Sequence, residues 1–381
     1  MLSEKQKYID LLFEEIAKQI SITEAMIDKA EASYESVGKW LGDGLRYDLV
    51  VTPQGSMNLG TTIKPISDED DYDIDLVAIM KNGQSLTAGQ IKTIIGNRLK
   101  ENHLYAEKIA AEGEGKRCWK MQYDEFHMDI LPCVPVSIYL EPNITSIRLT
   151  HKNEEGFYED RYSDPYKFRQ WFESRMHVVL DRKKKDYSVR NNVELHKVPT
   201  YRVKTPLQMA IQLLKRHRDI MFCNNKDMAP ISVIITTLSA HAYNGEESIY
   251  EALVIIVTNM HRYIEIREGH YFIPNPARKN ENFADKWNEN PAIAYAFNNW
   301  LKKVRNDVLE EPEKMAGIDS FGDHFGSVFG KAPVNRALKS LGVSTKKAGD
   351  SGNLYVNGLT SGLTVSSSNG VLVKGHTFYG L

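Results

Sequence analysis

Two aspartates, Asp73 and Asp75, stand two residues apart in the segment Tyr72–Met80. Because strand side chains alternate in direction, both carboxylates point to one face while Ile74 and Leu76 point to the other. Two like charges about 4 Å apart repel by roughly 4 kcal/mol at an effective dielectric constant near 20. A bound cation offsets this repulsion, and oxygen-rich sites suit Mg²⁺. The spacing therefore predicts a divalent-cation site at the start of a buried strand.

Asp129 is the candidate for a third carboxylate ligand. It is the lone acid in the apolar segment Phe126–Pro132, where an unpaired charge is costly. The alternative is a structural acid satisfied by backbone amides or an arginine. Two Mg²⁺ ions about 3.5–4 Å apart would clamp the attacking and leaving oxygens of an in-line displacement at the α-phosphorus. Asp73 and Asp75 would bridge both ions, Asp129 would bind the ion that carries the attacking hydroxyl, and Mn²⁺ is an alternative metal. The acidic residues 68–71 are interpreted as a solvated loop.

The Gly55-Ser56 turn upstream of the acidic strand is the candidate nucleotide-binding element. Gly55 would let the backbone approach a triphosphate closely, and the hydroxyl or amide of Ser56 can donate to it. A Gly-Ser pair means little by itself, so this interpretation depends on the downstream carboxylates. Together they predict nucleotidyl transfer from nucleoside triphosphates.

Composition limits the class of protein. The chain has 381 residues, enough for two domains, and a net charge of -2, which argues against obligate binding to long nucleic acid. Its cysteines, Cys118, Cys133 and Cys223, are widely spaced and form neither a zinc pattern nor a disulfide framework. No apolar run is long enough to span a bilayer, and the N-terminus lacks a secretory layout. We therefore expect a cytoplasmic protein with no zinc and no membrane partner.

The first half of the chain mixes helical and strand patterns. Possible capping boxes at Ser3–Gln6 and Ser21–Glu24 and apolar residues at helical spacing predict that residues 4–42 form one long kinked helix or two consecutive helices. Beyond them we expect strands at 47–52 and 72–80, a helix at 87–101, and paired strands at 117–123 and 126–132. This order predicts an α/β (α+β) lobe with the acidic strand near the middle of its sheet.

The second half is mostly helical. Thr205, Pro206 and Gln208 combine an N-cap, a proline at the first helical position and a capping-box glutamine. Further helices are expected from Pro230 through Tyr243, at 247–265 and at 288–309. We therefore predict a helix-plus-core domain at 1–165, a helical lobe at 166–330, and a Gly/Ser-rich tail at 331–381 that is expected to be mobile.

Several motifs together resemble a known family. Gly55–Pro65 with Asp73–Leu76 resembles the polymerase-beta-type nucleotidyltransferase signature. Further segments narrow the resemblance to the bacterial cGAS/DncV-like nucleotidyltransferases (CD-NTases): Thr205–Asp219, Pro230–Thr237, Asn275-Pro276 and Glu281–Trp287. The resemblance extends over roughly residues 5–330.

The family resemblance implies a fold and an activity. The fold would be a polymerase-beta-like nucleotidyltransferase core and an oligoadenylate-synthetase-like helical lobe, braced by a long N-terminal helix, with the active site in the cleft. The activity would be synthesis of cyclic di- or trinucleotides from ATP or other nucleoside triphosphates. These products would act as second messengers in bacterial anti-phage (CBASS) signalling.

The same resemblance implies roles for individual residues. It maps four of them onto the family's catalytic positions: Ser56, Asp73, Asp75 and Asp129. Lys215 and Ser232 correspond to helical-lobe residues that touch the donor triphosphate. From the residues alone, Lys215 belongs to a polar stripe with Gln208, Gln212 and Asp219, and an exposed lysine is the alternative. Ser232 is equally well an ordinary serine in a first helical turn. Phe283 and Trp287 are expected to pack within the lobe.

Partners and rival functions complete the expectations. Without a zinc-ligand cluster or a basic excess, activation by double-stranded DNA is not expected. The terminal Gly380-Leu381 resembles relatives conjugated by a ubiquitin-transfer-like accessory protein, with a frayed tail as the alternative. Two rival functions remain. One is a template-independent RNA 3′-end nucleotidyltransferase, which would need a basic track for RNA. The other is a catalytically silent nucleotide-binding module.

Overall fold

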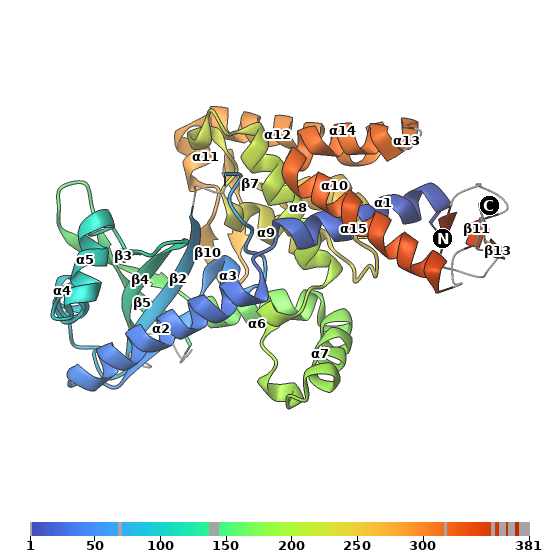
Figure 1. Ribbon diagram of the computed structural model, residues 1–381. Coiled ribbons are helices and arrows are strands. Elements are labelled where there is room, and N and C mark those ends of the chain that lie inside the picture. The colour runs from blue at the N-terminus through green and yellow to red at the C-terminus, as the bar shows by residue number, and fades with distance from the viewer. Residues whose placement is uncertain are drawn as a thin grey trace.

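The computed structural model describes residues 2–67, 71–136, 145–315 and 318–351, together with the short segments 355–357, 363–364 and 370–372. Figure 1 shows a lobe built on a β-sheet beside a lobe of helices. Each lobe has its own large hydrophobic core. No helix in the described part of the chain has the length and apolar character needed to cross a membrane.

The N-terminal region forms two helices, α1 (Glu4–Ile20) and α2 (Glu24–Gly44). This confirms the expected alternative of two consecutive helices rather than one long bracing helix. Each helix belongs to a different core. The buried face of α1, which includes Phe13 and Ile16, packs among the C-terminal helices. The buried face of α2, which includes Ala30 and Val37, packs on the sheet (Figure 1). The junction between the two helices therefore also joins the two cores.

The caps of these helices correct one prediction. The box at Ser3–Gln6 is confirmed, but the box at Ser21–Glu24 is wrong. The Ser21 hydroxyl donates back to the carbonyl of Ala17 (2.7 Å), so Ser21 ends α1. Thr23 caps α2 instead, because its hydroxyl accepts from the backbone amide of Met26 (3.2 Å).

The N-terminal lobe is built on a mixed six-stranded sheet in the order β1-β2-β4-β5-β6, with β3 also paired to β4. Strands β2 and β4 run parallel, and the other pairs are antiparallel. The strands are β1 (Leu49–Pro53), β2 (Tyr72–Met80), β3 (Trp119–Gln122), β4 (Phe126–Pro135), β5 (Ile147–Lys152) and β6 (Tyr158–Ser163). The helices of this lobe besides α2 are α3 (Gly55–Asn58), α4 (Ala88–Lys100) and α5 (His103–Glu112). The acidic strand lies inside the sheet, as predicted.

The two faces of β2 differ as its alternation predicts. Ile74 and Leu76 are fully buried in the core formed with α2, α4 and α5. On the opposite face, Asp73 and Asp75 precede Val77, which packs with Leu131 of β4 in a small cluster. Asp73 and Asp75 thus lie at one end of the sheet face that α2, α4 and α5 do not cover.

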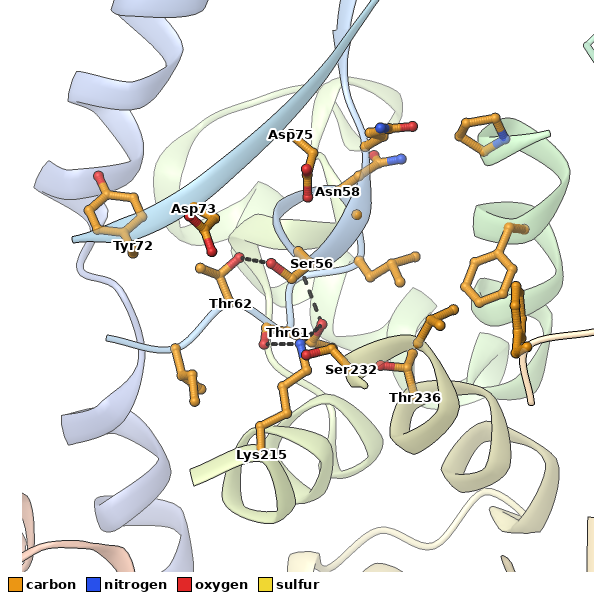
Figure 2. A pocket seen from close by; sticks show the side chains of 18 of the residues that line it. Ser56, Asn58, Thr61, Thr62, Tyr72, Asp73, Asp75, Lys215, Ser232 and Thr236 are labelled. Carbon is orange, nitrogen blue, oxygen red and sulfur yellow. Dashed lines mark hydrogen bonds between the residues drawn. The ribbon is translucent and has the colours of Figure 1, made fainter. Parts of the chain in front are cut away.

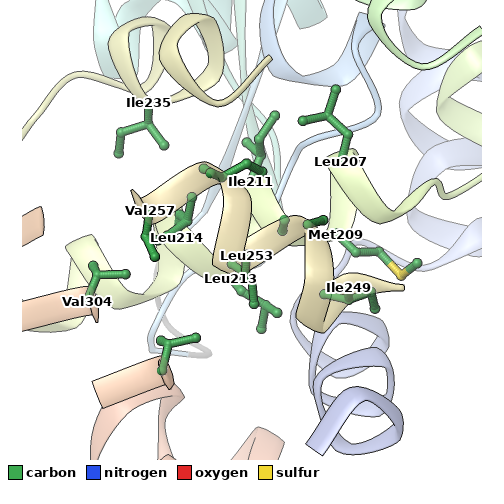
Figure 3. Close-up of a cluster of buried hydrophobic side chains, with 14 of the residues drawn as sticks. Leu207, Met209, Ile211, Leu213, Leu214, Ile235, Ile249, Leu253, Val257 and Val304 are labelled. Carbon is green, nitrogen blue, oxygen red and sulfur yellow. The ribbon is translucent and has the colours of Figure 1, made fainter. Parts of the chain in front are cut away.

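The C-terminal lobe gathers around α8 (Pro206–Met221), whose capping box at Thr205–Gln208 is confirmed. Its apolar side chains, including Leu207, Ile211 and Leu214, pack with residues of neighbouring helices such as Leu253 and Val304 (Figure 3). Burying each such side chain is worth roughly 1.5–3 kcal/mol. The surrounding helices are α6 (Pro165–Arg175), α7 (His177–Asn191), α9 (Ser232–Ala242), α10 (Ile249–Asn259), α11 (Asp285–Glu289), α12 (Pro291–Arg305), α13 (Glu311–Lys314), α14 (Ile318–Phe329) and α15 (Lys331–Asp350). Short strand pairs complete the lobe: β7 (Glu265–Arg267) with β8 (His270–Phe272), and β9 (Pro274–Asn275) with β10 (Arg278–Asn282).

The segment that was expected to be a mobile tail begins as a helix. Residues from 331 onward continue as α15, which packs against α1 and α14 (Figure 1). Val334 and Ala337 are fully buried there, because apolar residues recur at helical spacing within this Ser- and Lys-rich stretch. The short strands β11 (Tyr355–Asn357), β12 (Leu363–Thr364) and β13 (Gly370–Leu372) follow. The division at residues 165 and 166 stays a prediction, and Gly380-Leu381 lie outside the described residues.

Candidate active site

A cavity of about 590 Å³ lies between the two lobes. Its walls come from α3, the segment 59–65, the start of β2, and the helices α8 and α9 (Figure 2). Six of the seven site residues expected from the sequence line it: Gly55, Ser56, Asp73, Asp75, Lys215 and Ser232. The seventh, Asp129, is not among the lining residues.

The three carboxylates lie on one face of two neighbouring strands. Asp75 is directly opposite Asp129, and Asp73 is opposite His127, in the parallel pairing of β2 with β4. Burial, then the charges of Asp129 and Asp73, raise the pKa of Asp75 to about 7. Desolvation and the charge of Asp129 also raise the pKa of Asp73. The positively charged side chains nearby therefore do not offset the negative charge of these carboxylates.

Asp129 is turned toward a different partner. The thiol of Cys118 donates to its Oδ2 (3.2 Å), and Lys120 of β3 is its register partner on the other side from Asp75. Burial raises the pKa of Cys118 to about 12, so this thiol stays protonated and remains a donor. Within the described ranges, no three His, Cys, Asp or Glu side chains are gathered closely enough to hold a metal ion. The strands thus bring the three acids to adjacent positions, but the side chains do not close around a common point.

Gly55 and Ser56 form the turn beneath Asp75. Gly55 has φ +60°, a conformation that L-residues rarely adopt, and a Cβ there would lie 2.4 Å from Oδ2 of Asp75. The Ser56 hydroxyl is bonded to the Thr62 hydroxyl (3.0 Å), and both face the cavity (Figure 2). Only glycine at position 55 lets the backbone and the carboxylate approach this closely.

Lys215 and Ser232 approach the cavity from the helical lobe (Figure 2). The Lys215 side chain is not an exposed lysine, since it is only 4% exposed and donates to the carbonyl (3.1 Å) and the hydroxyl (3.3 Å) of Thr61. Burial lowers its pKa to about 7. Ser232 lies in the first turn of α9, as predicted, although the helix begins at Ser232 rather than at Pro230. Its hydroxyl accepts from Arg218 (3.0 Å).

Several charged residues of the cavity were not expected there, Arg218 and Asp71 among them. Arg218 lines it, although the sequence placed it only within the segment Thr205–Asp219 of the family resemblance. Asp71 also lines it, where its carboxylate pairs with His127 (3.0 Å) and accepts from Gln122. The interpretation of residues 68–71 as a solvated loop is therefore wrong for Asp71, and 68–70 lie outside the described residues. The sequence did contain an indication of this. Asp71 is two residues before Asp73, so both side chains point to the same face of the strand.

The far wall of the cavity combines aromatic and polar groups. Phe168 and Phe283 line it with their ring centroids 6.3 Å apart. Beside them, Asn275 is buried and its side-chain amide donates to Glu281 (2.8 Å). Phe283 is therefore more than a packing residue, whereas Trp287 is buried in the lobe as expected. No local pattern links these positions, which only the fold brings together.

Comparison with known proteins agrees with this geometry. Residues 50–133 match the family model described as cyclic GMP-AMP synthase DncV-like, nucleotidyltransferase domain. A c-di-GMP synthase of Roseivirga ehrenbergii is 29% identical, over 96% of this chain and 95% of the relative. The cyclic dinucleotide synthase CdnG of Bradyrhizobium diazoefficiens is 24% identical, over 87% of this chain and 83% of the relative.

Solved structures show the same fold. The structure of B. diazoefficiens CdnG in complex with GTP superposes with a TM-score of 0.68 at 22% identity, covering 88% of this chain and 99% of that one. The structure of Vibrio cholerae DncV with non-hydrolysable GTP gives a TM-score of 0.51 at 14% identity, covering 88% and 89% of the two chains. With its two-lobed architecture and the strand-borne aspartates beside a Gly-Ser turn, the chain carries a DncV-like nucleotidyltransferase domain at residues 50–133 and is similar over most of its length to cyclic dinucleotide synthases.

Proposed function

We propose that this protein joins nucleoside triphosphates into a cyclic dinucleotide, with release of pyrophosphate. The observation that carries the proposal is the pair of carboxylates, Asp73 and Asp75, on the wall of an inter-lobe cavity that also contains Ser56. Similarity over nearly the full length of a c-di-GMP synthase supports the cyclic product. The c-di-GMP synthase and the GTP-bound neighbour favour GTP as a substrate, alongside the ATP expected from the sequence.

The donor set suits a divalent cation. Asp73 and Asp75 offer only oxygen ligands, and the raised pKa of Asp75 reflects burial first and then the charges of neighbouring aspartates, which a cation would offset. Asp73, Asp75 and Asp129 would hold two Mg²⁺ ions, or Mn²⁺, once Asp129 exchanges its bond with Cys118 for the metal. Bound metal would supply charge neutralisation at the α-phosphate and lower the pKa of the attacking ribose hydroxyl.

The remaining cavity residues have complementary roles in this proposal. Ser56 would donate to the triphosphate, and Lys215 and Arg218 would supply positive charge on the opposite side. Ser232 would contact the same phosphates from the start of α9. Phe168 and Phe283 offer aromatic surface for a nucleobase. The triphosphate would therefore lie between the two lobes, with the nucleobase against the helical lobe.

The biological role follows from the family. We propose that the product is a second messenger in anti-phage (CBASS) signalling and that an accessory protein acts with the enzyme. Phage plating on cells that carry the intact system tests the role. Asp75→Asn should remove protection, whereas Asp48→Asn, an exposed acid paired with Lys81, should keep it. Equal protection by both variants would contradict a role for the synthase.

Product analysis tests the enzymatic proposal. Purified protein incubated with GTP, ATP and Mg²⁺ should yield pyrophosphate and a product that resists phosphatase and has the mass of a cyclic dinucleotide. Asp73→Asn with Asp75→Asn should reduce turnover by at least about a thousandfold, because the charge stabilisation at the reacting phosphate is lost. Asp48→Asn serves as the control.

Three outcomes would contradict the proposal. Extension of a labelled RNA by more than a few nucleotides would favour RNA tailing. Only linear, phosphatase-sensitive products would exclude ring closure. Nucleotide binding without turnover under any metal condition would indicate a silent binding module.

A further inference from the structure

A stripe of polar side chains from the helical lobe forms hydrogen bonds with the backbone of one wall of the cavity. The segment 59–65 follows Ser56, and its carbonyls accept hydrogen bonds from Lys204 and from residues along α8. The pairs, written as donor to carbonyl, are Gln208 to Leu59 (2.9 Å), Lys204 to Gly60 (2.7 Å), Lys215 to Thr61 (3.1 Å), Gln212 to Thr62 (2.7 Å) and Arg216 to Lys64 (2.7 Å). Positions 208, 212, 215 and 216 share one helix face, which explains the polar stripe in the sequence.

Gln212 occupies the middle of this stripe and has no access to the cavity. Its side chain is fully buried, and its amide donates to the Thr62 carbonyl (2.7 Å). Its oxygen lies 3.1 Å from the Ser21 hydroxyl, whose single proton is shared with the Ala17 carbonyl (2.7 Å). Ser21 ends α1 and forms an isolated antiparallel bridge with Ile63. Gln212 therefore connects the junction of the two N-terminal helices to the segment behind Ser56.

The Thr62 side chain links the backbone held by Gln212 to Ser56. Its hydroxyl is bonded to the hydroxyl of Ser56 (3.0 Å), and both residues line the cavity (Figure 2). The Thr61 amide also donates to the Ser56 carbonyl (2.9 Å). The direction of the Ser56 hydroxyl thus depends on where the backbone of Thr62 is held.

We propose that Gln212 is a positioning residue for triphosphate binding, acting through Thr62 on Ser56. The inference rests on the proposed nucleotidyl transfer, because it assigns Ser56 to the phosphate end of the ligand. Thr62 is itself buried, so loss of the Gln212 donor would leave a buried carbonyl unpaired. The segment would then relax, and Ser56 would lose the direction in which its hydroxyl is held.

Binding measurements with two ligands separate positioning from general loosening of the fold. Affinities for GMP and for a non-hydrolysable GTP analogue are measured with Mg²⁺ on the wild type and on Gln212→Met, which keeps the length but removes both polar atoms. We expect affinity for the triphosphate to fall about tenfold and affinity for GMP to change less than about twofold. An equal loss for both ligands, or no loss, would overturn the proposal.

A double-mutant cycle tests the route through Thr62. Thr62→Val removes the hydroxyl that contacts Ser56 and keeps the shape of the side chain. If Gln212 acts through this hydroxyl, the double variant should bind the triphosphate no more weakly than the weaker single variant. Additive losses would mean that Gln212 acts by another route and would refute the proposal.

Two controls keep the result interpretable. Gln90→Met removes the capping-box glutamine of α4, away from the cavity, and should leave the preference for triphosphate over monophosphate unchanged. If Gln212→Met does not fold, Thr62→Val alone must show the selective loss, and wild-type affinity in that variant would refute the proposal. A wild type that binds neither ligand would defeat the proposed function itself, and this inference with it.

Discussion

Asp75 and Asp129 lie directly opposite each other on the parallel strands β2 and β4, yet only Asp75 lines the cavity. The difference lies in the partners of the two carboxylates. Asp75 stands over Gly55, whereas Asp129 accepts a hydrogen bond from the thiol of Cys118. Metal binding at all three acids would therefore have to compete with that thiol.

Cys118→Ala should make the enzyme easier to activate with metal. Removal of the thiol releases the Asp129 carboxylate from a hydrogen bond, which is worth about 0.5–1.5 kcal/mol net. The Mg²⁺ concentration for half-maximal activity should fall about threefold to tenfold, with kcat nearly unchanged. A titration of initial rate against Mg²⁺ measures this.

Cys223→Ala, at an exposed cysteine, is the control and should behave like the wild type. A higher Mg²⁺ requirement in Cys118→Ala would show the reverse, that the thiol holds Asp129 ready for the metal.

Asp75→Asn should stabilise the metal-free protein at high pH. The folded pKa of about 7 exceeds the ordinary aspartate pKa of 3.8, so the folded state holds this proton more tightly than the unfolded chain. Ionisation of Asp75 therefore does not destabilise the fold below about pH 4, and it destabilises the fold to its full extent above about pH 7. Since Asp75 keeps some solvent contact, we expect a gain on the order of 2 kcal/mol at pH 8.

Thermal unfolding in EDTA at pH 5 and pH 8 measures this difference. The advantage of Asp75→Asn should be larger at pH 8, and Mg²⁺ should stabilise the wild type more than the variant. Asp48→Asn is the control for charge removal alone. A pH-independent difference between Asp75→Asn and the wild type would mean that neither burial nor the neighbouring charges raise the pKa of Asp75 in the folded protein.

Gly55→Ala should abolish activity. The new Cβ would lie 2.4 Å from Oδ2 of Asp75, and φ +60° is itself strained for alanine. The turn or the carboxylate must move, so turnover should fall by at least about a hundredfold. Steady-state rates at saturating nucleotide and metal measure the loss.

Gly156→Ala is a matched control, because φ is +88° there and a Cβ would meet no atom within 4 Å. Both variants should lose roughly 1–2 kcal/mol of stability from backbone strain, but only Gly55→Ala should lose activity. Full activity in Gly55→Ala would show that the close approach to Asp75 is dispensable.

Nucleotide binding at pH 8.5 should take up a proton at Lys215. Burial lowers the pKa of this amine to about 7, so it is mostly neutral at that pH in the free protein. An anionic triphosphate nearby favours the charged form. Calorimetry in two buffers of different ionisation enthalpy should show uptake of about 0.5–1 proton per bound GTP analogue.

Lys215→Met should abolish this uptake, and Lys81→Met, at an exposed lysine, should leave it unchanged. Asp75 should contribute little to the proton uptake at pH 8.5, since its pKa is about 7 and it is already ionised. Uptake that persists in Lys215→Met would exclude Lys215 as the responsive group.

Local patterns in the sequence were sufficient for much of the fold. The alternation of Asp73 and Asp75 with Ile74 and Leu76 predicted which face of β2 is polar, and the structure has that alternation. The Thr205–Gln208 capping box predicted where α8 begins. Patterns of this kind succeed because they depend on backbone periodicity and on hydrogen bonds between residues only a few positions apart.

The same local rules failed where two signals competed within a few residues. Ser21 and Thr23 could both cap α2, and the Ser21 hydroxyl bonded the preceding helix instead. Asp71 shared the parity of Asp73, but its pairing with His127 requires β4 to lie beside β2. A competing partner four residues away decided the case of Ser21, and a neighbouring strand decided the case of Asp71.

The amino-acid sequence by itself determined the strand alternation, the caps and the glycine turn, because each is encoded within a few adjacent residues. Only the tertiary structure decided that Gln212 meets the carbonyl of Thr62, 150 positions away, and that Phe168 meets Phe283. It also turned Asp129 toward Cys118. Contacts of this kind depend on how two separately formed cores pack against each other, and no local spacing carries that information.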